Sequence, residues 1–323
     1  FGSANSVSIY NGLAAVAIEN SVDRTLPGTI KLFDTSTRAL SSGINSIQVG
    51  ALPDMVTFTA NGQTLLVANE ATPTTYGGFD PAGSVSIIDM STRSVTATAG
   101  LNGVAQSGSY IRQASSTGMD FEPEYITTNA AGTKAYVTLQ EANAIGVLDL
   151  QSNSFSQVIG LGAKNFAAPG NSIDPSHKDG KIQLRSANVV GLYQPDSIAA
   201  YEAKGKTYLV MANEGDTRED DGDKARVKDK AGLSGAPSDL GQLNVSTTDS
   251  TSGTNLVTFG GRSFSIRDDN GNLVFDSGNQ LDAEAIARGI YDDGRSDDKG
   301  VEPEGVSPMT LGGRTLAFIG LER

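Results

Sequence analysis

The sequence predicts an all-β chain that forms a β-propeller of four-stranded blades, and three observations lead to this prediction. One phrase recurs along the chain. The 38 glycines and the absence of tryptophan suit many short strands joined by tight turns. No long apolar stretch has the 3.6-residue period of a helix. A β-sandwich is the alternative architecture, but it gives no reason for one motif to repeat five times.

The recurring phrase is a pair of short strands around a glycine-bearing turn, which is typical of a β-hairpin. Each of the four clear copies opens with proline and an acidic residue, and every copy closes with glutamate. The four clear copies and a fainter first one are Pro53–Glu70, Pro123–Glu141, Pro195–Glu214, Pro303–Glu322 and Asn5–Glu19.

A third strand follows four of the five hairpins, and a fourth strand comes after a further turn. Four antiparallel strands that repeat every 50 to 70 residues or so are typical of propeller blades. Because one hairpin lacks a third strand, we expect residues 1–323 to form a single propeller domain that is incomplete at its C-terminus, with about five of six to seven blades. The expected third strands are 28–34, 83–89, 143–149 and 261–268, and the expected fourth strands include 95–99 and 273–275.

Two segments rich in Gly, Asp and Ser interrupt the repeat, at 163–190 and 215–260. Loops of this length are usually either functional or disordered. The single histidine, His177, lies in a polar part of the first insertion, which favours a solvated loop residue over a metal ligand or a general base.

Composition excludes several classes of function. The net charge of −13 disfavours binding to nucleic acid or to anionic membranes, and no window has the apolar length of a membrane helix. The absence of cysteine excludes disulfides, thiol nucleophiles and cysteine-bound zinc. No signal peptide opens the chain, so we expect Phe1 to begin a mature or trimmed product.

The repeat places its carboxylates at one end of every blade. In each hairpin the acid after proline opens the first strand and the glutamate closes the second, so antiparallel pairing brings the two to the same end. The first strand of a blade lines the central channel, and the acids are therefore expected to converge on one mouth of that channel. The expected positions are Asp54, Glu124, Asp196 and Glu304, with Asn5 in the first blade, and Glu19, Glu70, Glu141, Glu214 and Glu322 beside them.

So many carboxylates would repel one another unless they were hydrated, protonated or bridged by cations. Hard oxygen ligands without cysteine favour Ca²⁺ or Mg²⁺ over zinc, and we expect Ca²⁺ because ligands from several blades make a roomy, irregular cage. The same acids could instead simply hydrate the channel mouth. Asp216 begins an acidic loop at 216–223, which suits a second cation site as well as a solvated loop. The predicted metal ligands are Asp54, Glu70, Glu124, Glu141, Asp196, Glu214, Asp216, Glu304 and Glu322.

Basic residues approach the same face, and together with a bound cation they could neutralise a phosphate. Arg226, Lys299 and Arg323 are the candidates for stabilising charge on a transferred phosphoryl group, and Arg295 lies nearby in the sequence. Glu124 or Glu304 could serve as the base. Ordinary surface salt bridges are the alternative interpretation of the basic residues.

Several long phrases of the chain resemble the bacterial choice-of-anchor I family of extracellular propeller proteins. They include LPDMVTFTANGQTLLVANE, DFEPEYITTNAAGTKAYVTLQEANAIGVLDL and RSDDKGVEPEGVSPMTLGGRTLAFIGLER, and they occur in the expected order. The family is similar to mesenchyme-specific cell-surface glycoproteins, and some bacterial members are described as alkaline phosphatases. The resemblance implies a secreted, periplasmic or cell-surface protein with calcium binding and phosphoesterase activity.

Two functions therefore remain open at this point. The first is a calcium-dependent phosphoesterase that acts on a phosphate ester at the acidic channel mouth. The second is a non-catalytic surface module that calcium stabilises and that docks a polysaccharide, a matrix component or a neighbouring protein. Neither involves nucleic acid or insertion of this segment into a membrane.

Overall fold

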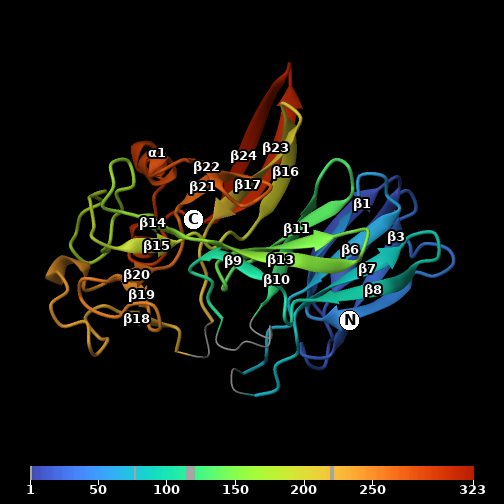
Figure 1. Cartoon of the computed structure of the whole chain (residues 1–323), viewed down its shortest axis with the longest axis horizontal. Coiled ribbons are helices and arrows are strands. Elements are labelled where there is room, and N and C mark those ends of the chain that lie inside the picture. Colours follow the sequence, from blue (N-terminus) through green and yellow to red (C-terminus); the bar gives the residue numbers. More distant parts are fainter. Residues whose placement is uncertain (1, 76–77, 114–120, 219–221) are drawn as a thin grey trace. The chain divides into compact units, whose positions relative to one another are not determined.

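The computed structural model describes residues 2–75, 78–113, 121–218 and 222–323, and the chain folds into two compact units. It confirms the predicted fold class, because the chain is mainly antiparallel β-structure whose four-stranded sheets follow the sequence order of propeller blades (Figure 1). In the part of the chain that is described, no helix is both long and apolar enough to span a membrane. Unit 1 is Phe1–Ser107, Arg112–Gly160 and Ile198–Thr207, and unit 2 is Gly108–Ile111, Leu161–Ser197 and Tyr208–Arg323.

Three blades account for most of unit 1. In each, four consecutive strands pair in sequence order, and the third blade gains β9 beyond its fourth strand. The predicted third strands correspond to β3, β7 and β12, and the fourth strand predicted at 95–99 lies within β8. The strands are β1 (Ala4–Tyr10), β2 (Leu13–Ile18), β3 (Pro27–Asp34), β4 (Ser46–Ala51), β5 (Pro53–Phe58), β6 (Thr64–Asn69), β7 (Ser84–Asp89), β8 (Ser94–Gly100), β9 (Gln106–Ser109), β10 (Pro123–Thr128), β11 (Lys134–Leu139), β12 (Ala144–Asp149) and β13 (Ser154–Leu161).

The first strands of successive blades in unit 1 pack against one another, as expected for the inner strands of a propeller. The amide of Val56 on β5 donates to Ser6 Oγ on β1 at 3.3 Å, and the amide of Phe58 donates to Ser8 Oγ at the same distance. Apolar side chains between the first two blades form a buried core that includes Leu65 and Val67. Polar contacts at the inner strands and apolar packing behind them thus hold the blades together.

The acid that follows the repeated proline lies at a β-bulge. Pro53 pairs with Asn69, but the next paired residue is Met55 with Ala68, so that the register shifts around Asp54. The same shift follows Pro123 on β10 and Pro303 on β23. A bulge twists the strand locally and redirects a side chain, which is why these acids need not follow the ordinary strand alternation.

The repeat continues beyond the third blade with one more four-stranded sheet and one hairpin. The sheet has the order β16-β17-β21-β22, and the hairpin pairs β23 with β24. The third strand predicted at 261–268 is β21, and the fourth predicted at 273–275 lies within β22. These strands are β16 (Ile198–Ala203), β17 (Lys206–Asn213), β21 (Ser263–Asp268), β22 (Leu273–Asp276), β23 (Pro303–Leu311) and β24 (Arg314–Leu321).

The described parts of the two insertions fold together within unit 2. Val190 of the first insertion pairs in parallel with Val257 of the second, and a buried apolar cluster that includes Phe166, Leu243 and Val245 joins them. The described parts of the two insertions therefore share one apolar core. Their elements are β14 (Ala163–Asn165), β15 (Val190–Leu192), β18 (Lys224–Arg226), η2 (Ser238–Leu240), β19 (Asn244–Ser246) and β20 (Val257–Thr258).

A helix and a turn precede the last hairpin and carry the chain to the candidate site. Helix α1 (Gln280–Arg288) ends at Gly289, whose φ of 70° is a left-handed conformation that glycine adopts without strain. The short η3 (Asp293–Arg295) follows. Asp282 of α1 is fully buried and accepts a hydrogen bond from the amide of Val301 at 3.3 Å, so the helix anchors the loop that leads into β23.

Candidate functional site

Three glutamates converge in unit 2. Glu214 follows β17, Glu302 precedes β23 and Glu322 follows β24, and one carboxylate oxygen from each lies within 4.8 Å of the others. The backbone sets this position, because the amide of Glu322 donates to the carbonyl oxygen of Glu302 at 2.9 Å. Glu302 has φ of 49°, an unusual conformation for a residue with a side chain that often marks a functional position. We call these three residues the glutamate cluster.

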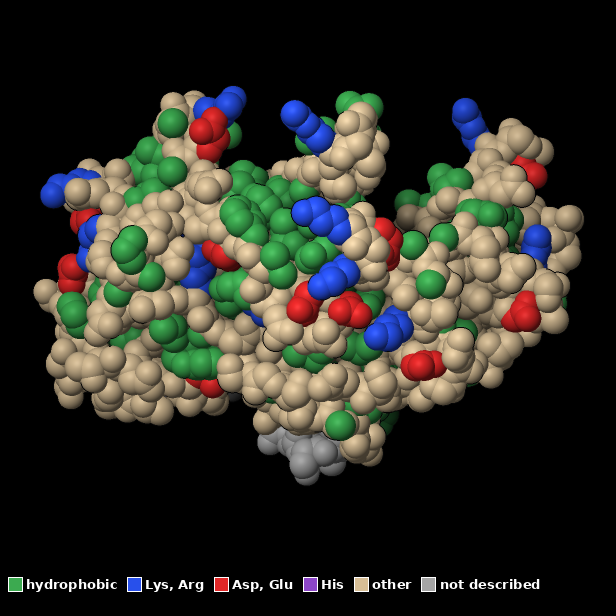
Figure 2. Space-filling model, turned by 45° about the horizontal axis from the view of Figure 1, so that its top comes forward, with side chains coloured by type: hydrophobic (Ala, Val, Ile, Leu, Met, Phe, Trp, Pro, Cys, Tyr) green, Lys and Arg blue, Asp and Glu red, His purple; other side chains and the backbone are tan. Residues whose placement is uncertain are grey.

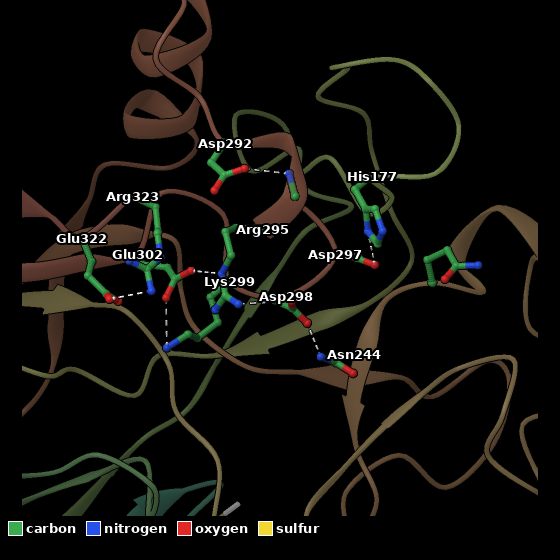
Figure 3. Close-up of polar contacts among 12 residues, drawn as sticks. His177, Asn244, Asp292, Arg295, Asp297, Asp298, Lys299, Glu302, Glu322 and Arg323 are labelled. Carbon is green, nitrogen blue, oxygen red and sulfur yellow. Dashed lines mark hydrogen bonds and ion pairs between the residues drawn. The ribbon is translucent and has the colours of Figure 1, made fainter.

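Basic side chains accompany the glutamate cluster, and Figure 3 shows Arg295, Lys299 and Arg323 beside Glu302 and Glu322. Lys299 Nζ lies 2.5 Å from Glu214 Oε1 and 3.2 Å from Glu302 Oε2. Arg295 Nε donates to Glu302 Oε1, and Arg323 Nη2 lies 2.8 Å from Glu322 Oε1. Figure 2 shows a similar mixing of basic and acidic side chains on the face that it displays. Three cations therefore accompany three carboxylates.

The ion pairs shift the pKa values of the buried partners. Burial alone would lower the pKa of Lys299, but the negative charges of Glu214, Asp216 and Glu302 outweigh burial and raise it. Burial would raise the pKa of Glu302, whereas the hydrogen bond from Arg295 and the charge of Lys299 lower it. At neutral pH both partners are therefore charged.

A cavity of about 270 Å³ is lined by Arg295 and Lys299, the two basic residues that pair with Glu302 of the glutamate cluster. Four of the residues that line the cavity are basic and two are acidic, and Phe259 adds an apolar side. Such a lining suits a small anion with several oxygens, since charge-assisted hydrogen bonds from Arg and Lys are strong. The lining residues are Asp216, Thr217, Lys224, Arg226, Asn244, Phe259, Arg295, Asp298 and Lys299.

Arg226 is held at the cavity by two neighbouring aspartates. Its Nη1 lies 2.9 Å from Asp297 Oδ2 and 3.0 Å from Asp298 Oδ1, and it donates to the carbonyl of Gln242 at 2.8 Å. Asp297 is fully buried, and His177 Nδ1 lies 2.8 Å from its Oδ2. His177 is therefore not simply a solvated loop residue: its side chain is 30% exposed and faces a buried carboxylate.

Unit 1 holds a second set of predicted acids. Burial, with a contribution from the negative charge of Glu141, raises the pKa of Asp54 to about 6, while Arg24 opposes the shift. Asp54 and Glu141 come from neighbouring blades. Glu124 and Glu141 are buried, and Glu70 accepts a hydrogen bond from Thr72.

The remaining predicted site residues divide within unit 2. Asp216 lines the cavity, whereas the side chain of Glu304 is exposed, and its carbonyl oxygen accepts a hydrogen bond from Ser197 Oγ. Asp196 is half-buried. Three acids of the loop predicted at 216–223, residues 219–221, lie outside the described residues. Of the predicted residues, unit 2 brings together Glu214, Glu322, Lys299, Arg323, Asp216 and Arg226.

Sequence reasoning missed Glu302, Asp297, Asp298 and Asn244. A signal for Glu302 was present, because it precedes the repeated proline, where Leu52 and Gln194 also adopt positive φ. Asp297, Asp298 and Asn244 lie outside the repeat, and no spacing pattern in one sequence connects them.

Comparisons with known proteins bear on the family and the fold. The family model of the choice-of-anchor I domain matches residues 1–323. No curated protein matches the chain. Hydrazine synthase of Kuenenia stuttgartiensis is similar at 15% identity, with 84% of this chain and 48% of that chain covered and a TM-score of 0.44. The WD40 repeats of RRP9 are similar at 9% identity, with 66% and 45% covered and a TM-score of 0.39. The chain thus spans about half the length of these structures.

Proposed function

Because the chain belongs to the choice-of-anchor I family, we propose that it is an extracellular calcium-binding propeller that hydrolyses phosphate esters in the cavity beside the glutamate cluster. One observation carries the proposal: Lys299 and Arg295 contact the glutamate cluster and also line the basic cavity. The proposed cation site and the proposed anion site therefore lie side by side, as metal-assisted phosphoryl transfer needs.

The residues of the glutamate cluster fit calcium. The donors are carboxylate oxygens, and Glu302 Oε2 is buried, with the ammonium of Lys299 3.2 Å away. Calcium takes six to eight oxygens in irregular geometry, and water can complete a set that three glutamates begin. The ammonium of Lys299 now lies against two of these carboxylates, which indicates that the position attracts a cation. Glu214, Glu302 and Glu322 would hold the ion.

The chain's own residues supply the remaining chemistry. When bound, calcium would add positive charge that polarises a phosphoryl oxygen. Arg226 and Arg295 orient the phosphoryl group and stabilise its charge. Asp216 accepts a proton from the attacking water as the new P–O bond forms and the ester P–O bond breaks. The departing alkoxide takes a proton from solvent, and Asp216 then returns its own proton to solvent.

Hydrolysis of p-nitrophenyl phosphate tests this proposal. We expect turnover with calcium, loss of turnover in EGTA, and at least a tenfold loss of rate in Glu302→Gln. Glu284→Gln is the matched control, because Glu284 is an exposed residue of α1 that pairs with Arg288 outside the cavity. The proposal fails if purified chain with added calcium shows no turnover, or if Glu302→Gln and Glu284→Gln have equal rates.

A second candidate is a non-catalytic module that calcium stabilises and that binds a surface polysaccharide or matrix component. One observation favours it: Lys299, Arg295 and Arg323 already balance the three glutamates, so the network can serve stability alone. This candidate predicts that calcium raises the melting temperature by mass action while no phosphate ester is hydrolysed.

A further inference from the structure

Lys299 belongs to two sites at once. Its ammonium contacts Glu214 Oε1 at 2.5 Å and Glu302 Oε2 at 3.2 Å, and the side chain lines the basic cavity. Lysine has a flexible stem of four carbons, so the ammonium can move by several ångströms without a change in the backbone. The same ammonium can thus pair either with the carboxylates or with an anion in the cavity.

A calcium ion and this ammonium compete for the same carboxylates. Calcium lies 2.3 to 2.6 Å from its oxygen ligands. The ammonium is at a comparable distance from Glu214, and two cations so close together repel one another. An ion at the glutamate cluster therefore requires Lys299 to withdraw from Glu214 and Glu302.

Once it withdraws from the carboxylates, the ammonium of Lys299 can pair with an anion in the cavity. The cavity that Lys299 lines is also lined by Arg226, Arg295 and Lys224, and an anion there would attract it. Without such an anion, release of Lys299 leaves one more positive charge among those that already line the cavity. An anion in the cavity and a cation at the glutamate cluster consequently favour each other.

We propose that Lys299 is a tethered cation that competes with calcium for Glu214 and Glu302 and that, once displaced, strengthens anion binding in the adjoining cavity. The inference rests on the proposed function and adds its regulation, since it makes calcium and phosphate bind cooperatively. Such coupling is reciprocal: calcium raises the affinity for the anion by the factor by which the anion raises the affinity for calcium. Couplings between sites are typically about 5- to 150-fold.

Calorimetric titrations of the whole chain test the competition directly. Calcium is titrated into the wild type, Lys299→Met and the control Lys181→Met, which removes an exposed lysine of the first insertion. Methionine keeps most of the apolar stem but lacks the charge. We expect Lys299→Met to bind calcium about tenfold more tightly than the wild type, and Lys181→Met to match the wild type. If Lys299→Met does not fold, Lys299→Gln replaces it.

The coupling is measured with phenylphosphonate, a phosphate-ester analogue that cannot be hydrolysed at an ester bond. We expect calcium to tighten the binding of phenylphosphonate to the wild type at least fivefold. For Lys299→Met, the factor by which calcium tightens this binding should be less than half as large. The inference is overturned if the wild type binds calcium and Lys299→Met binds it no more tightly, or if the two show equal coupling. If neither protein binds calcium, the proposed calcium site itself is wrong.

Discussion

Asp282 makes the stability of the chain depend on pH in a way that a single substitution can reveal. Burial raises the pKa of Asp282 to about 6 from its ordinary value of 3.8, while Arg262 and the Val301 amide oppose the shift. Its Oδ2 is buried and accepts no hydrogen bond. The folded chain therefore favours the protonated form of this carboxyl more than the unfolded chain does.

The sign and size of the effect follow from this pKa. Because the folded pKa lies above the unfolded one, the associated stability is fully present below about pH 4 and is lost as pH rises through about 6. The interval from 3.8 to about 6 corresponds to about 3 kcal/mol, since one pKa unit is worth about 1.36 kcal/mol. Asp282→Asn mimics the protonated form at every pH. It should match the wild type near pH 4 and be more stable by up to about 3 kcal/mol at pH 8.

Urea unfolding between pH 4 and pH 8 provides the assay. Far-ultraviolet circular dichroism is the suitable signal, because the chain has no tryptophan. Taking the difference between variant and wild type at each pH removes the titration of the other carboxyls. Asp229→Asn, an exposed aspartate of the second insertion, should show no such difference. If Asp282→Asn is less stable than the wild type at pH 8, the ionised pair with Arg262 stabilises the fold and the reasoning is refuted.

Three further substitutions test the packing. Leu65→Ala opens a cavity in a fully buried part of unit 1 and should cost about 2–5 kcal/mol in urea unfolding; a cost below 1 kcal/mol would contradict this packing. Gly215→Ala should lower the melting temperature, since Gly215 has φ of 97° and a Cβ would lie 2.3 Å from Gly260 N; an unchanged melting temperature would argue against this backbone. Lys164→Met leaves Asp276, 2.8 Å from the ammonium in the wild type, without its buried partner. It should cost about 3–5 kcal/mol in chemical denaturation, and a neutral result would show that the pair contributes nothing.

The repeat made the blades predictable because strand pairing is governed by local pattern. Alternating apolar residues, the glycine turn and the closing glutamate recur, and the hairpins from Pro53 to Glu70 and from Pro123 to Glu141 pair as their spacing implies. The bulges were not predicted from the spacing, although the shift after Pro53 recurs after Pro123 and Pro303 in the corresponding hairpins.

The candidate site was predictable only where it lies on the repeat. Glu214 and Glu322 follow the second strands of two copies of the repeat, so they occupy equivalent positions that the repeat makes visible. Asp297 and His177 meet because an insertion of unit 2 folds back on the loop before β23, and tertiary contacts of this kind leave no periodic signal. The site also depends on the positive φ of Glu302, which no local propensity favours.

A crystal structure of the chain grown with calcium tests the central claim most directly. We expect an ion within about 2.3–2.6 Å of oxygens from Glu214, Glu302 and Glu322, with the ammonium of Lys299 withdrawn from Glu214 and Glu302. Calcium bound elsewhere, with Lys299 still in contact with Glu214, would contradict the account.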